Sequence, residues 1–383
     1  MEDISRYINK HEYKKAYNKV YKAILKKDIT AYKYMGDLYL HGYFVKKNAS
    51  KAIEYYQKGI EACDYNSYIA LGVLFLEGKE IDRDLEEAYE LFFEAYQNNA
   101  KNSLFYMGYM TLNGFGCVES FNEAERFFLL GREKKEDLSI YALANLYFKS
   151  NLVSNNIMKA ITLLKEAALL NNIKALKRLG DIYFSSDYVT PDLKYSFECY
   201  KKAASLGDLE SMINTGEAYQ YGYGVKIDYK MAYKYYSMAL NKKYLKSYNR
   251  LADLYYYGHG VKKDKIKAYD YYIEASKNIE DVEEIAYASF CAGKMKMYGD
   301  GVSKDYNLAY KLINTSLASF DFPMSHLLKG KCLINGYGCD VDLNLGYKEL
   351  KIANDNGVID EEHLLDMLVV DMDSNVGFKN WGV

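Results

Sequence analysis

The residues that could support catalysis or bind a metal are few in this sequence, and their spacing does not fit the common sites. Residues 11–15 begin the H-E-x-x-H pattern of zinc sites, but Lys15 stands where the second histidine would be. No glycine-rich loop ends in the Lys-Ser/Thr pair that holds phosphate. Residues 340–351 imitate a calcium loop, but Leu345 replaces the required glycine and Lys351 the required glutamate. We therefore expect no catalytic residue, no metal site and no cofactor.

The cysteines do not suggest a disulfide scaffold or a redox pair. Six cysteines in 383 residues are too sparse for a scaffold, and no two form a C-x-x-C motif. For Cys332 and Cys339 we expect one buried thiol and one loop thiol.

The composition excludes several classes of protein. Half of the chain is hydrophobic and 27% is charged, which excludes a disordered chain. Fifty basic and 52 acidic residues leave a net charge of −2, so no basic footprint for nucleic acid or an anionic membrane appears. No apolar run has the length of a membrane span or of a secretory signal. We expect a cytoplasmic protein that binds neither nucleic acid nor a membrane.

The sequence contains an internal repeat, and this repeat predicts the helices that must position any functional residue. A small residue recurs at intervals of 36 residues six times, then of 41 and 37. We call this residue the anchor of each copy; the nine anchors are Gly36, Gly72, Gly108, Ala144, Gly180, Gly216, Ala252, Gly293 and Gly330. Large residues stand 20 positions after each anchor, and further columns of Gly, Ala or Ser stand 5 before and 16 and 23 after it. Small and large residues alternating at spacings of three and four mark one face of a helix, so each copy holds two helices.

The join between the two helices is also regular. Glycine stands six positions after the anchor in seven copies, and serine in the fourth and fifth. Glycine at that place predicts a left-handed helix end. A residue able to cap the next helix follows twelve positions after each anchor: Asn48, Asp84, Ser120, Asn156, Asp192, Asp228, Asp264, Asp305 and Asp342.

The turns carry a family resemblance. The segments GYGVKID (222–228), GHGVKKD (258–264) and GDGVSKD (299–305) resemble the Sel-1-like repeat, a relative of the tetratricopeptide repeat. The resemblance covers about residues 30–358, although the fourth and fifth copies lack the double-glycine turn. It implies an all-α fold, a right-handed α/α superhelix or solenoid of nine repeats over residues 31–358 that behaves as one array. We expect an N-terminal capping helix within 1–30, a lone helix at 11–27, and a C-terminal capping helix at 359–373 before a tail at 374–383.

The resemblance also implies a function and the surface that would carry it out. Proteins of this kind generally act as scaffolds or adaptors, and their first helices line a concave face that can bind a peptide or protein partner. Two positions on that face lie two before and one after the anchor, and nearby tyrosines could act as anchors for a partner. The predicted partner-binding residues are Asn145, Arg178, Asp181, Asn214, Glu217, Tyr221, Arg250, Asp253, Tyr257, Lys294 and Lys331. An alternative is that Arg178 with Asp181, and Arg250 with Asp253, are only surface pairs worth about 0.2–0.5 kcal/mol.

Other functions stay open. A regulatory subunit or a host-directed effector would have the same sequence features as a scaffold. A cysteine-rich branch of the family is associated with β-lactam hydrolysis, but the irregular cysteines here disfavour that activity.

Two features concern the ends of the sequence. Residues 1–30 carry eight basic and four acidic groups, whereas residues 340–383 carry three and ten. These opposite charges could favour weak head-to-tail self-association at low salt; the alternative is a monomer with two solvated ends. Phe378 and Trp381 suggest that the tail docks on its own chain or on a partner; plain disorder is the third possibility.

Overall fold

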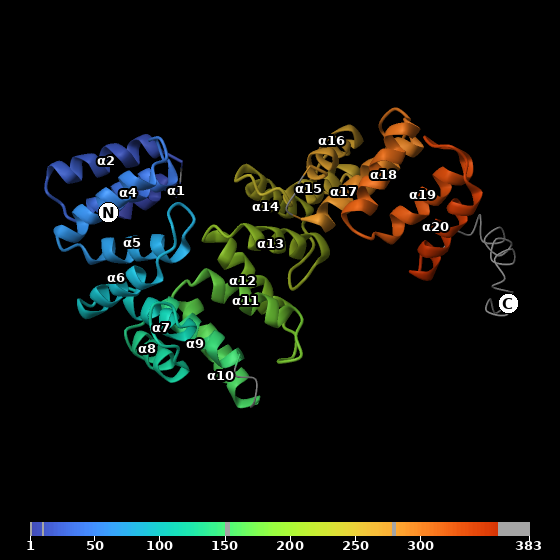
Figure 1. The fold of residues 1–383 in the computed structure, drawn as a ribbon. Coiled ribbons are helices and arrows are strands. Elements are labelled where there is room, and N and C mark those ends of the chain that lie inside the picture. Colours follow the sequence, from blue (N-terminus) through green and yellow to red (C-terminus); the bar gives the residue numbers. More distant parts are fainter. Residues whose placement is uncertain (1, 10, 150–153, 278–280, 359–383) are drawn as a thin grey trace. The chain divides into compact units, whose positions relative to one another are not determined.

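The computed structural model describes residues 2–9, 11–149, 154–277 and 281–358. Every regular element in these ranges is an α-helix and no strand occurs, which confirms the predicted all-α class (Figure 1). In chain order the helices are α1 (Glu2–Asn9), α2 (Tyr13–Leu25), α3 (Ala31–His41), α4 (Ala49–Glu61), α5 (Tyr65–Glu77), α6 (Leu85–Gln97), α7 (Ser103–Asn113), α8 (Phe121–Glu133), α9 (Asp137–Lys149), α10 (Ser154–Leu169), α11 (Ile173–Phe184), α12 (Leu193–Ser205), α13 (Leu209–Tyr221), α14 (Tyr229–Asn241), α15 (Ser247–Tyr257), α16 (Lys265–Ala275), α17 (Val282–Tyr298), α18 (Tyr306–Ser319), α19 (Pro323–Asn335) and α20 (Leu343–Asp355).

The joins confirm the turn chemistry expected from the sequence. The seven glycines six positions after their anchors all adopt left-handed backbone, with φ from 61° to 81°, and end the first helix of the pair. At the next helix start, side chains such as Asp84 and Ser120 accept a hydrogen bond from the amide three residues later. The fourth copy differs, because α10 begins at Ser154 and Asn156 lies inside the helix. The prediction that Asn156 caps this helix is therefore wrong.

Small anchors allow the two helices of a pair to approach closely. A Cβ added at Gly36 would collide with the ring of Tyr56, and one at Gly216 with the ring of Tyr236. Both tyrosines are almost fully buried, at 1% and 0% exposure. The column of large residues therefore packs directly on the column of anchors and forms the core of each pair.

The N-terminal cap differs from the prediction. The helix expected at 11–27 is present as α2, but it is not alone, because α1 precedes it. Ile4 of α1 is buried in one apolar cluster with Ala16 and Val20 of α2. Helix α1 is short and lacks the columns of small residues, so the repeat pattern could not predict it. The C-terminal capping helix predicted at 359–373 and the tail at 374–383 lie outside the described residues.

The chain divides into two compact units, Met1–Leu179 and Gly180–Val383, and the division falls within α11. Within the described residues, no helix combines the length and the apolar character needed to cross a membrane.

Candidate functional site

In the first unit, a groove of about 750 Å³ lies along α7, α9 and the beginning of α11. Aromatic side chains form much of its wall, and Lys149, Lys174 and Arg178 supply positive charge. The lining residues are Phe105, Tyr109, Leu112, Asn113, Phe128, Leu138, Tyr141, Ala142, Asn145, Leu146, Phe148, Lys149, Lys174 and Arg178. Within the described part of the chain, no carboxylate lines this groove. Its chemistry therefore suits a ligand with apolar side chains and negative charge.

Arg178 and Asn145, both predicted partner contacts, lie together in this groove. The Arg178 guanidinium donates a hydrogen bond to Oδ1 of Asn145. Its central carbon lies 4.1 Å from the ring centroid of Phe148, which is a cation–π contact. Arg178 stands two positions before the anchor of its copy, and Asn145 stands one position after the anchor of the preceding copy. This bond therefore joins neighbouring copies. It also holds the guanidinium in one place at the edge of the groove.

In the second unit, Arg250 of α15 has its partners on the neighbouring helices. Its Nε donates to Glu217 Oε1 of α13 at 2.8 Å, and its Nη2 lies 3.2 Å from Glu284 Oε1 of α17. Burial alone would lower the pKa of this guanidinium, but the carboxylates of Glu284 and Glu217 outweigh burial and raise the pKa above its usual value. Arg250 thus ties three successive first helices together.

The aspartates one position after the anchor accept hydrogen bonds from buried or partly buried tyrosines. Asp253 accepts from Tyr272 at 2.6 Å and from Tyr287 at 2.9 Å. Burial is the main reason why the pKa of Asp253 is raised. Asp181 accepts from Tyr200 in the same way at 2.7 Å. The predicted surface pair of Arg250 with Asp253 is therefore not how either side chain is held, since the partners described here lie on other helices.

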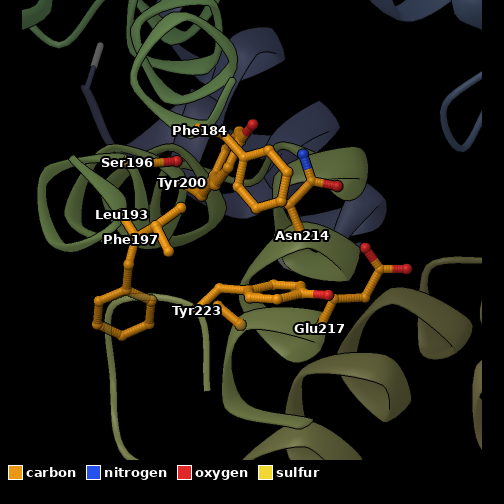
Figure 2. Close-up of a pocket in the computed structure, with 9 residues that line it drawn as sticks. Phe184, Leu193, Ser196, Phe197, Tyr200, Asn214, Glu217 and Tyr223 are labelled. Atoms are coloured by element: carbon orange, nitrogen blue, oxygen red, sulfur yellow. The ribbon is translucent and has the colours of Figure 1, made fainter. Parts of the chain in front are cut away.

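A second, smaller cavity of about 110 Å³ lies in the second unit (Figure 2). Phe184, at the end of α11, and Tyr223, in the turn after α13, form two walls with ring centroids 5.3 Å apart and planes inclined by 80°. Figure 2 shows Asn214 beside Phe184, and Glu217 beyond the hydroxyl end of Tyr223. The remaining lining residues are Leu193, Ser196, Phe197, Tyr200 and Ala218. We call this cavity the Phe184 pocket.

The sequence belongs to a known repeat family. The family model described as Sel1 repeat matches more than half of the chain, over residues 29–62, 66–99, 102–134, 138–172, 173–208, 209–244, 245–278 and 286–314. The chain belongs to the Sel1 repeat family. The last helix pair, α19 and α20, follows the final matched Sel1 repeat. It keeps the family packing, because a Cβ at Gly330 would meet Leu350.

Two solved structures are similar to this chain at low sequence identity. A protective antigen of uropathogenic Escherichia coli with an SLR fold is 17% identical, with a TM-score of 0.50 over 93% of each chain. A Sel1 repeat protein from Oxalobacter formigenes is 18% identical, with a TM-score of 0.46 over 89% of this chain and 87% of that one. No curated protein matches the chain. Sel1-repeat solenoids, which are tetratricopeptide-like, generally act as protein-interaction scaffolds rather than as enzymes.

The other predicted contact residues of the Sel1 copies are more scattered. Tyr221 and Tyr257 are exposed, at 53% and 60%. The Lys294 ammonium lies 6.0 Å from the ring centroid of Phe290, and Lys331 is partly buried in α19. The structure therefore gathers Asn145 and Arg178 in one groove and Asn214 and Glu217 at one pocket. Phe378 and Trp381 lie outside the described residues.

The sequence analysis missed the aromatic lining of the groove in the Sel1 copies three and four. Phe105 and Tyr141 stand three before their anchors, and Phe148 stands four after its own. This spacing places them beside the polar positions that we did predict. A search for aromatic residues three positions before and four positions after each anchor would have found them.

Among the described residues, no group of three His, Cys, Asp or Glu side chains could hold a metal ion. Cys332 is buried and Cys339 lies partly buried after the helix, as expected.

Proposed function

We propose that this chain is a scaffold that binds a protein partner through the faces of its first helices. We further propose that the groove of the first unit binds an extended peptide segment that carries apolar and carboxylate side chains. The observation that carries the proposal is the composition of this groove, which combines aromatic walls with three cationic side chains and no carboxylate.

The groove provides two kinds of contact. Phe105, Tyr109 and Tyr141 offer partly exposed rings, which gain free energy when a partner removes them from water. Lys149 and Lys174 are exposed at its edge and can pair with acidic side chains. Because Arg178 is already fixed by Asn145 and Phe148, it presents its remaining N–H donors without a large loss of side-chain entropy.

The test is a capture experiment followed by a measured affinity. The full chain is used as bait, captured proteins are identified by mass spectrometry, and the affinity of a purified partner is measured by calorimetry. The double variant Tyr109→Ala with Lys174→Glu removes one ring and reverses one charge in the groove. We expect it to weaken binding at least about tenfold, the equivalent of ~1.4 kcal/mol.

A matched control separates groove binding from a general effect of the changes. Phe121 and Lys101 are also exposed in the first unit, and neither lines the groove. Phe121→Ala with Lys101→Glu should therefore bind as the unmodified chain does. If both double variants bind the partner equally well, the groove is not the binding site.

A further inference from the structure

We propose that a groove along helix α2 binds residues 360–373 of a second molecule of this chain, so that molecules associate head to tail. This inference goes beyond the proposed scaffold function, because it concerns a different surface and needs no other protein. It depends on the lysines that line the groove and on the charge of residues 360–373, which lie outside the described residues.

The groove lies in the first unit and has a volume of about 440 Å³. Tyr7 of α1 contributes a ring to its lining, and α2 with the residue that follows it contributes four lysines: Lys15, Lys19, Lys22 and Lys26. Within the part of the chain that the structure describes, no carboxylate lines this groove. We call it the lysine groove.

The four lysines lie on one face, because their spacing of four, three and four residues follows the turns of a helix. Like charges at this spacing repel one another and destabilise a helix. Lys15 has an acidic neighbour, since Oε2 of Glu12 lies 3.0 Å from its ammonium. Lys22 and Lys26 are exposed, and among the described side chains no carboxylate pairs with either. An acidic segment bound on this face would therefore relieve the repulsion.

Residues 360–373 have the opposite composition to α2. They contain no lysine or arginine and six acidic residues, namely Asp360, Glu361, Glu362, Asp366, Asp371 and Asp373. Residues 13–27, by contrast, contain six lysines and no acidic residue. The hydrophobic residues of the acidic segment can contact the ring of Tyr7 and the methylene stems of the lysines. This complementarity favours the two segments as partners and speeds their encounter.

The contact joins two different surfaces, so it is heterologous. A dimer formed in this way still has one free lysine groove and one free acidic segment. Further molecules can therefore join, unless the association closes into a ring. We expect the average mass to increase with protein concentration.

The test measures the mass of the full chain by analytical ultracentrifugation over a range of protein concentrations. At an ionic strength of about 20 mM, where charges are weakly screened, we expect the average mass to rise with concentration. At about 500 mM we expect the monomer, because the screening length is then below about 8 Å.

Two charge-reversed variants locate both halves of the contact. Lys22→Glu with Lys26→Glu reverses the lysine groove, and Asp366→Lys with Asp371→Lys reverses the acidic segment. Each variant alone should associate at least about tenfold more weakly than the unmodified chain. A mixture of the two should associate again, because each groove then meets a segment of opposite charge on the other variant.

A matched control makes the same change of charge away from α2. Lys262 and Lys263 are exposed and line a separate lysine-rich cavity in the second unit. Lys262→Glu with Lys263→Glu should therefore associate as the unmodified chain does.

Three outcomes would overturn the inference. They are a monomer mass at every concentration in low salt, equal weakening by the control and by the groove variant, and a mixture of the two reversed variants that stays monomeric. None of them bears on the groove along α7, α9 and α11, because Tyr109 and Lys174 are unchanged in every variant. The failure of this inference and the failure of the proposed function can therefore be told apart.

Discussion

The ring of Tyr337 lies flat against the ring of Tyr306, with centroids 4.4 Å apart and planes inclined by 7°. Tyr337 stands seven after its anchor, and Tyr306 stands thirteen after the preceding anchor. His259 stacks on Tyr229 in the same relationship, with centroids 4.4 Å apart. Asp300 and Lys265 occupy these positions in another copy and form an ion pair instead. The turn of one copy thus rests on the second helix of the preceding copy, by stacking or by charge.

The Asp300 ion pair should make stability depend on pH. The hydrogen bonds from Lys265 and from Tyr256 lower the pKa of Asp300 below its usual value. A depressed folded-state pKa contributes stability above the unfolded pKa of about 4, and that contribution is lost as the pH falls further through the folded pKa. We therefore expect Asp300→Asn to lower Tm near neutral pH, with a difference that shrinks below about pH 4. Thermal unfolding from pH 3 to 7 measures it, with Asp270→Asn, at an exposed aspartate of α16, as the control. A difference that is constant across this range would contradict the prediction.

Tyr272→Phe should destabilise the second unit although the ring is kept. The change removes the 2.6 Å hydrogen bond to Asp253 and leaves a largely buried carboxylate with fewer donors. We expect a loss of about 1–3 kcal/mol, measured by urea unfolding. Tyr271→Phe on the same helix is the control, since among the described residues its hydroxyl has no hydrogen-bond partner. If both variants unfold at the same urea concentration, the hydroxyl of Tyr272 has no structural role.

Arg250→Ala should be much more harmful than the loss of an exposed arginine. It leaves Glu217 and Glu284 near each other without the guanidinium between them. We expect a loss of about 3 kcal/mol, whereas Arg250→Lys should lose less because it keeps the charge. Arg126 pairs with Glu123 at 3.5 Å and its side chain is 72% exposed, so Arg126→Ala should cost less than about 1 kcal/mol. Comparable losses for Arg250→Ala and Arg126→Ala would show that the Arg250 cluster is no stronger than a surface pair.

Gly224→Ala should be costly for two reasons, and Gly222→Ala for one. Both glycines have left-handed backbone, with φ of 70° and 81°, which costs an alanine about 1–2 kcal/mol. At Gly224 a Cβ would also collide with the carbonyl oxygen of Leu193, whereas at Gly222 the nearest atom, in Ile227, is 3.2 Å away. The Tm of Gly224→Ala should therefore fall further than that of Gly222→Ala. Equal Tm values would mean that the turn moves away from α12 without loss.

Most helices were predictable because each copy of the repeat carries the same signals for where a helix begins, where it ends and how it packs. The glycine ends, the aspartate caps and the small anchors recur at fixed spacing, and the structure uses them as expected. The short helix α1 and the early start of α10 were not predictable, because neither follows the repeat.

The internal role of the acidic residues could have been found in the sequence. An acidic residue stands one after the anchor only in copies with a tyrosine twenty after it: Asp37 with Tyr56, Asp181 with Tyr200, Glu217 with Tyr236, and Asp253 with Tyr272. In the aspartate copies, the tyrosine donates to the carboxylate at 2.6–2.9 Å. We interpreted Asp181, Glu217 and Asp253 as partner contacts, with surface pairs to Arg178 and Arg250 as the alternative for the two aspartates, because we compared each position separately and did not compare the two columns. The pockets could not be predicted, because their volume depends on the packing of long side chains from three helices against one another.

The bonds between neighbouring copies have a mechanical consequence. Several of the bonds that tie one copy to the next join residues only 33 to 35 positions apart, as in Arg178 with Asn145 and Asn249 with Glu284. Such bonds lie one after another along the chain, so tension on the two ends of a unit loads them in turn. A single-molecule pulling trace should therefore show successive steps of about 12 nm, the extended length of one copy. A partner that spans several first helices would have to release before those steps appear, so bound ligand would be visible as a higher first rupture force.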